Sequence, residues 1–210
     1  MMGVMRRAEL PDLGEHQVVF SLPGADDDDL VAACEVLWQE GHRVWSVPPA
    51  RIDDLAVLRT VFGRRALLGV HDLTDATQTA AAVAAGAGLL ASVYCLPEVV
   101  AAADGVPVVL GGLTPQELRA CHQAGASAVQ VVPCEAFGTG YARGLPELVS
   151  EIPLLATGRL EHYQAALWLS SGALGVWPMH LVSSELVADD GLGELRTLAQ
   201  RWRLGDEAGA

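Results

Sequence analysis

The two adjacent polar residues His71 and Asp72 are the strongest candidates for chemistry in this sequence. They directly follow the apolar run 66–70, at the point where a buried strand would end. An imidazole accepts a proton near neutral pH, and a neighbouring carboxylate orients it and stabilises its charged form. We therefore expect His71 and Asp72 to act as an acid–base pair. The structural alternative is that Asp72 caps the next helix.

Two further predicted strand ends carry reactive or charged groups. Glu135 is a third candidate acid–base residue. Its neighbour Cys134 could act as a nucleophile only with a nearby base, and a small buried thiol is the simpler interpretation. The guanidinium of Arg159 could bind a carboxylate or a phosphate with two parallel hydrogen bonds. Alternatively, Arg159 fills space and pairs with an acid. Bulky aromatic residues at strand ends could line an apolar pocket or plug it: Trp45, Tyr94 and Trp177.

The sequence contains no lysine, because all 13 basic residues are arginine. Imine formation with a carbonyl compound needs a primary amine, and only the N-terminal amine, outside the repeating pattern, is left to supply one. A metal would need ligands from scattered segments, namely His71, Asp72, Glu135 and His180, with no His-x-His or HExxH spacing. We therefore expect neither a metal nor another cofactor.

These residues are positioned by a repeated unit in which a helical pattern ends at glycine and a short apolar run follows. Apolar runs without alternation are typical of parallel strands buried on both faces. Eight strands are predicted, at 17–22, 43–47, 66–70, 89–93, 106–110, 128–132, 152–156 and 173–177. Helix starts are indicated by the acidic run 26–29, by the capping sequence 114–117, and by Pro97 and Pro146.

Eight strand–helix units predict a single-domain α/β protein with the (β/α)8 TIM-barrel fold. The barrel is expected over residues 17–204, after an N-terminal lead-in of residues 1–16 and before a C-terminal tail of residues 205–210. An open doubly wound sheet is the alternative, but no G-x-G-x-x-G follows the first predicted strand.

The charge balance narrows the choice of partners. The formal net charge is −13, which argues against nucleic acid and against an anionic membrane surface. No signal peptide or membrane span is evident in the sequence, so we expect a cytoplasmic protein. A small anionic metabolite remains compatible, because one local arginine can act against the global sign.

Three segments resemble the 2-keto-3-deoxy-6-phosphogluconate (KDPG) and 4-hydroxy-2-oxoglutarate (KHG) aldolases. They are VPVVLGGLTPQEL at 106–118, AVQVVPCE at 128–135 and ATG at 156–158, in the family's order and spacing. The resemblance implies the barrel fold and a homotrimer. It also places Gln130 where the family has its Schiff-base lysine, Ser46 where it has a proton-shuttling glutamate, and Arg159 at a phosphate-binding glycine.

The resemblance therefore implies a KDPG-aldolase-like barrel that cannot use a lysine imine. The favoured hypothesis is a lysine-independent lyase or isomerase acting on a small anionic, oxo-acid-like metabolite. Its catalytic residues would be His71, Asp72 and Glu135, and its ligand-binding residues Arg159, Thr157, Gln130, Ser46, Tyr94 and Trp177. The alternative is a non-catalytic homologue that binds a ligand or a partner, which a mouth plugged by Trp177 and Tyr94 would favour.

Overall fold

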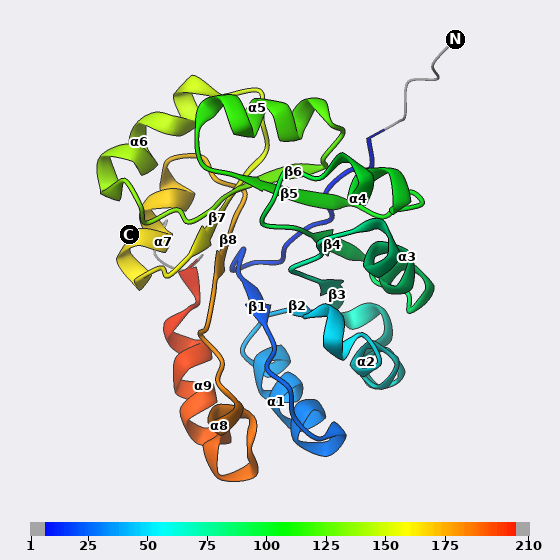
Figure 1. Ribbon diagram of the computed structural model, residues 1–210. Helices are drawn as coiled ribbons and strands as arrows, with labels where there is room; N and C mark the ends of the chain where they lie inside the picture. Colours follow the sequence, from blue (N-terminus) through cyan, green and yellow to red (C-terminus); the bar gives the residue numbers. More distant parts are fainter. Residues whose placement is uncertain (1–6, 205–210) are drawn as a thin grey trace.

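A computed structural model describes residues 7–204 of the chain (Figure 1). The outer parts of the predicted lead-in and tail, 1–6 and 205–210, and with them the N-terminal amine, lie outside the described residues. Strands and helices alternate along the chain. The strands are β1 (Val19–Ser21), β2 (Val44–Val47), β3 (Leu67–Val70), β4 (Leu89–Ala91), β5 (Val108–Gly112), β6 (Ala128–Val131), β7 (Leu154–Gly158) and β8 (Gly175–Pro178).

A helix follows each strand, with two after the last. They are α1 (Asp27–Gln39), α2 (Asp54–Phe62), α3 (Ala76–Ala84), α4 (Pro97–Ala102), α5 (Pro115–Gln123), α6 (Gly138–Leu148), α7 (His162–Ser170), α8 (Ser184–Val187) and α9 (Leu192–Arg201). Within residues 7–204, none of these helices is long and apolar enough to cross a membrane.

The eight strands form one parallel sheet in sequence order, and the sheet curls until its first and last strands meet. An isolated parallel bridge joins Val18 to Val176, and the amide of Val176 donates to the carbonyl of Gln17 at 2.8 Å. The helices surround the strands (Figure 1). The predicted single-domain (β/α)8 barrel is thereby confirmed.

Local signals account for most element boundaries. Thr114 and Glu117 form the predicted capping box of α5, and glycines that end helices adopt positive φ, among them Gly41 at 91° and Gly125 at 101°. β5 and β7 begin two residues later than predicted, each directly after a proline, Pro107 and Pro153. Proline has no N–H to donate to a strand ladder, so it marks the strand's edge.

The prediction that Pro146 starts a helix is wrong. Pro146 lies inside the last turn of α6, whose buried residues Ala142 and Leu145 precede it. Those two side chains anchor the helix to the barrel before the proline is reached. Pro146 has no N–H to donate to the carbonyl of Ala142, so the helix lacks one hydrogen bond there and ends two residues later.

Side chains alternate between the barrel interior and the layer beneath the helices, as the pleat of a strand requires. The interior is filled by small and branched residues, including Val19, Val44, Val109 and Leu155, and Leu13 packs with them. The opposite side chains form a second, larger core against the helices. Because the interior is packed, only the strand ends are available for chemistry.

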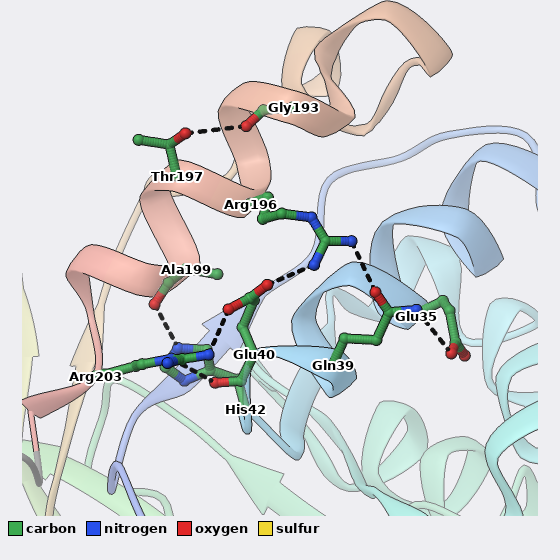
Figure 2. A network of polar contacts seen from close by, with 9 residues as sticks. All are labelled: Glu35, Gln39, Glu40, His42, Gly193, Arg196, Thr197, Ala199 and Arg203. Atoms are coloured by element: carbon green, nitrogen blue, oxygen red, sulfur yellow. Dashed lines mark hydrogen bonds and ion pairs between the residues drawn. The ribbon is translucent and has the colours of Figure 1, made fainter.

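The barrel seam is reinforced by polar contacts between α1, the loop after it, and α9 (Figure 2). The carboxylate of Glu40, only 4% exposed, accepts from Arg196 at 2.5 Å and from Arg203 at 2.5 Å. Burial raises the pKa of Glu40, but the hydrogen bonds from Arg196 and Gln200 and the arginine charges outweigh it and hold the pKa below its usual value. His42 Nε2 donates to the carbonyl of Ala199 at 2.8 Å.

Candidate active site at the barrel mouth

A small cavity of about 10 Å³ lies where the strands end, which is about the room of one water molecule. Five strands and three loops contribute to its lining: β1, β4, β6, β7 and β8, and the loops after β3, β4 and β8. The lining residues are Ser21, His71, Asp72, Ala91, Val93, Gln130, Thr157, Trp177 and Met179. In parallel barrels these carboxyl ends carry the active site. The predicted residues His71, Asp72, Gln130, Thr157 and Trp177 therefore meet at one cavity.

His71 is held between a buried hydroxyl and a carboxylate. Its Nδ1 lies 2.9 Å from Ser46 Oγ, and Ser46 is 1% exposed inside the barrel. Its Nε2 lies 3.8 Å from Asp72 Oδ2. Asp72 follows in the left-handed conformation, with φ at 56°, which turns the chain at the strand end. Ser46 thus fixes the ring, and Nε2 is the nitrogen that faces the carboxylate.

The electrostatics keep His71 neutral near pH 7. Burial lowers its pKa, the Asp72 charge raises it in part, and His180 lowers it again, so that the pKa lies below the usual value of histidine. A neutral imidazole can accept a proton. Once protonated, it would be stabilised by Asp72, so the pair has the arrangement of a general base and its counter-charge.

The cavity walls are held in place by hydrogen bonds. Trp177 is 3% exposed, its Nε1 donates to Ser21 Oγ at 2.9 Å, and its ring meets the His71 ring edge-on at 6.2 Å between centroids. The amide of Gln130 donates to the carbonyl of Ser92 at 2.7 Å. Gln130 and Trp177 are therefore fixed wall residues, and Ser21, absent from the predicted ligand set, is the partner that orients Trp177.

Thr157 differs from these wall residues because its hydroxyl has no hydrogen-bond partner in the described part of the chain. Its side chain is 3% exposed, and its Oγ1 is buried at the cavity. A buried polar atom without a partner costs free energy, commonly about 1–3 kcal/mol. A ligand carbonyl or carboxylate in this cavity would accept from Thr157 and remove that cost.

Glu135 lies apart from the cavity that His71 lines. It borders a second small pocket with Cys134 and residues of α6 and α7, and its carboxylate covers Gly158 so closely that a Cβ there would collide with it. Burial and then the Glu135 charge raise the pKa of the Cys134 thiol to about 12. A thiol with that pKa is protonated at neutral pH, so Cys134 is a buried structural residue.

The remaining predicted residues lie at the rim or behind the strands. Arg159 is exposed, and no ion pair joins it to an acid among the side chains that the structure describes. Tyr94 is 58% exposed and is not among the residues that line the cavity. The pocket and plug interpretations of Trp45 are both wrong. Trp45 points outward from β2 and packs edge-on against Phe62 at 4.8 Å, because its neighbours Val44 and Ser46 occupy the inward positions.

No group of three or more metal-ligating side chains comes together within residues 7–204. His71 and Asp72 are adjacent, whereas Glu135 is in the second pocket and His180 is exposed. What the mouth offers is a base, a counter-charge and one free hydroxyl around a space for a small group.

Known proteins similar to this chain include several aldolases. The 2-dehydro-3-deoxy-6-phosphogalactonate aldolase of Escherichia coli (strain K12) is 26% identical over 160 residues, which are 73% of this chain and 78% of that protein. A solved 4-hydroxy-2-oxoglutarate/2-dehydro-3-deoxyphosphogluconate aldolase is 26% identical, with a TM-score of 0.76 over 92% of this chain and 96% of its own.

The KDPG aldolase of Legionella pneumophila, solved with pyruvate as a covalent carbinolamine, has the same fold. It is 19% identical, with a TM-score of 0.79 over 90% of this chain and 94% of its own. No family model matches the chain. The curated relative and these solved structures are nevertheless all aldolases, and the uninterrupted strand order is that of a barrel. The chain is similar in sequence and fold to the KDPG/KHG aldolases, and its sequence contains no lysine.

Proposed function

We propose that this protein is an acid–base enzyme that enolises a small 2-oxo acid at the barrel mouth without forming an imine. The observation that carries the proposal is the ordered series Ser46, His71 and Asp72, which places His71 Nε2 beside its counter-charge at the cavity. The family's aldolases supply the substrate class, since the related proteins are named for 2-oxo acid and deoxy sugar-acid substrates.

Proton abstraction is the step these residues support. His71 Nε2 takes a proton from C3 of the 2-oxo acid, in the tautomer whose Nδ1–H donates to Ser46 Oγ. The C–H electron pair forms the C2=C3 bond, and the carbonyl π electrons move to the C2 oxygen. That oxygen accepts a hydrogen bond from the otherwise unpartnered Thr157 hydroxyl, while Asp72 stabilises the imidazolium. Return of the proton to C3 gives exchange, and its return elsewhere gives isomerisation or bond cleavage.

The other predicted residues have supporting roles in this proposal. Arg159 binds the substrate carboxylate or phosphate from the rim, where its guanidinium is exposed. Gln130 and Trp177 shape the cavity, and Tyr94 would contact a substrate that extends from the cavity to the surface. Glu135 orders the turn at Gly158 instead of acting on the substrate. We further propose a cytoplasmic homotrimer, which a mass measurement in solution would test against the 22.1 kDa chain.

Deuterium exchange tests the chemistry directly. Pyruvate and 2-oxobutyrate are incubated with the protein in D2O, and loss of the C3 proton signal is followed by NMR. Exchange by the wild type, its loss in His71→Gln and its retention in His180→Gln are expected, since His180 is exposed and does not line the cavity. Equal exchange by His71→Gln and the wild type would reject His71 as the base.

Borohydride trapping tests whether an imine is absent. Reduction in the presence of pyruvate should leave every peptide of the barrel unmodified, because no lysine is present to form the imine. A mass increase on a barrel peptide would contradict the proposal. Gln130→Lys alone should likewise not produce cleavage of 2-keto-3-deoxy-6-phosphogluconate, since Ser46 provides no carboxylate for the proton transfer.

A second candidate, a non-catalytic ligand-binding barrel, is favoured by the small size of the cavity. Its volume of about 10 Å³ must widen before a 2-oxo acid can enter, and its walls are hydrogen-bonded in place. Saturable binding of pyruvate in calorimetry, with no exchange at any pH, would establish this candidate in place of the enzyme.

A further inference from the structure

A wide hollow lies at the opposite end of the barrel from His71. It measures about 300 Å³, within the range of small-molecule sites, compared with about 10 Å³ at the mouth. It is formed by the N-terminal segment and the residues that lead into β2 and β3: Asp12, Gly14, Arg43, Val44, Arg64, Arg65, Ala66 and Leu67. We name it the basal hollow.

Three guanidinium groups converge on the basal hollow without a neutralising partner. Arg43, Arg64 and Arg65 are all exposed, and the arginine ion pairs formed within residues 7–204 use other arginines. The one acid in the lining is Asp12, whose Oδ1 accepts from the amide of Gly14 at 2.9 Å. In a chain with 26 acidic residues and a formal net charge of −13, such a positive cluster is unexpected.

Aromatic rings hold two of these guanidiniums in position. Arg43 and Arg65 both lie over the Trp38 ring, at 5.3 Å and 5.2 Å from its centroid, and Arg65 also lies 5.6 Å from the centroid of Phe62. Arg65 donates one of its N–H groups to the carbonyl of Val61 at 2.6 Å. A stacked guanidinium keeps its remaining donors available, and less side-chain entropy is lost when it binds an anion.

The apolar floor of the hollow strengthens the field of these charges. Val44 is buried at the start of β2, and Ala66 and Leu67 are half-buried at the start of β3. Charges beside a low-dielectric surface interact more strongly with a ligand than charges surrounded by water. The hollow therefore combines positive charge, preorganised donors and an apolar wall.

We propose that the basal hollow binds a small, multiply charged oxyanion, either a polyphosphate or a di- or tricarboxylate, at a site separate from the mouth. Guanidinium groups bind phosphate and carboxylate oxygens with the same paired hydrogen bonds, so both ligand classes share this chemistry. A single negative charge would leave two arginines unmatched, which is why the site favours a multivalent ligand. The ligand is small because the three arginines surround one hollow instead of a long track.

Calorimetric titration of the full chain at constant ionic strength tests the site, with tripolyphosphate and citrate as the two probes. We expect one saturable site for at least one probe. Arg64→Ala should weaken it about tenfold or more, because one charge-assisted contact is removed. Arg64 is suited to this test because it stacks on neither Trp38 nor Phe62. Asp12→Asn should tighten binding several-fold by removing the only negative charge in the lining.

Arg143→Ala is the matched control, since Arg143 is exposed on α6 and has no place in the hollow. It should bind the probe like the wild type, and so should His71→Gln and Arg159→Ala. Binding of tripolyphosphate alone identifies a phosphate ligand, and binding of citrate alone a carboxylate ligand. Failure of both probes to saturate the wild type would overturn the proposal. So would equal weakening by Arg143→Ala, unchanged affinity in Arg43→Ala/Arg64→Ala, or loss of binding in Arg159→Ala.

Discussion

At the mouth of the barrel, His71 and Asp72 stand beside a cavity of about 10 Å³, whereas at the base Arg43, Arg64 and Arg65 surround about 300 Å³. The mouth contains polar groups that are mostly paired with one another, as in the bonds of Ser46 to His71 and of Trp177 to Ser21. The base contains charges that are stacked on aromatic rings and unpaired with acids in the described residues.

The two ends of the barrel therefore differ in how their side chains are held in position for a ligand. Hydrogen-bonded walls fix reacting groups accurately but leave little space, which suits proton transfer on a small substrate. Stacked arginines leave donors and volume free, which suits binding of a charged ligand. Because β2 and β3 begin at the basal hollow and end near Ser46 and His71, the same two strands serve both ends.

The largest expected effect is on catalysis at the mouth. His71→Gln should lower the exchange rate of 2-oxo acids by about 100-fold or more, since general-base catalysis commonly contributes a factor of about 10²–10⁴. The melting temperature and tripolyphosphate binding should stay close to those of the wild type. A variant that lost both exchange and basal binding would show that the two ends are not independent.

The second largest effect is expected on the stability of the fold, when the buried carboxylate of Glu40 is changed. Glu40→Gln should lower the free energy of unfolding by about 2 kcal/mol at pH 7. The negative charge facing Arg196 and Arg203 is removed, and the glutamine amide has only one oxygen to accept the two hydrogen bonds that both carboxylate oxygens now accept. Urea unfolding measures the change. Glu35→Gln, a change at a half-buried position of α1 whose carboxylate accepts from Gln39 and not from either arginine, is the control.

The pH dependence of the Glu40 effect has a definite sign. The folded state lowers the pKa of Glu40, so its contribution is present above the unfolded pKa and is lost as the pH falls through the folded value. The difference between the wild type and Glu40→Gln should therefore shrink as the pH is lowered below about 4. A difference that grew in acid would mean that the interpretation of this ion pair is incorrect.

A smaller effect is expected at the rim. Arg159→Ala should weaken binding of pyruvate about tenfold and leave the melting temperature almost unchanged, because an exposed arginine contributes little to stability. Calorimetry and a melting curve of the same sample provide the two readouts. A marked loss of stability with unchanged affinity would assign Arg159 a structural role and favour the non-catalytic candidate.

The smallest effect is expected on the pH dependence of the exchange rate. The Asp72 charge raises the pKa of His71, so Asp72→Asn should lower that pKa further below its usual value. A base is active when unprotonated, so the acid limb of the exchange rate should move to lower pH. Activity near pH 7 should change little. An acid limb that stayed in place or moved upward would exclude Asp72 as the counter-charge of His71.

Much of the fold follows from the chain's local chemistry. Glycines at helix ends and apolar runs between them predicted all eight strands, because each signal depends on a few neighbouring residues. Likewise, His71, Gln130, Thr157 and Trp177 could be placed at one mouth, since parallel strands end on one edge. Pro146 misled the prediction because a proline in the first and in the last turn of a helix looks alike in sequence.

Other features depend on which way a side chain faces, and the sequence does not encode that locally. Trp45 and Ser46 are neighbours in β2, yet one lies under the helices and the other beside His71. Glu135 follows a strand end but turns into a different pocket. The basal arginines come from two separate lead-in segments, and no motif joins them. Only the register of the closed barrel brings such residues together or keeps them apart.

The contacts of Glu40 with Arg196 and Arg203 can form only late in the synthesis of residues 1–210. Glu40 and Arg196 are 156 positions apart, and Glu40 and Arg203 are 163 apart. A chain made from its N-terminus therefore presents Glu40 long before either arginine exists. Until then its carboxylate cannot leave water without a counter-charge. The ion pairs beside the seam between the first and last strands can therefore form only after Arg196 and Arg203 have been made, and a chain cut by a protease before Arg196 would lose them.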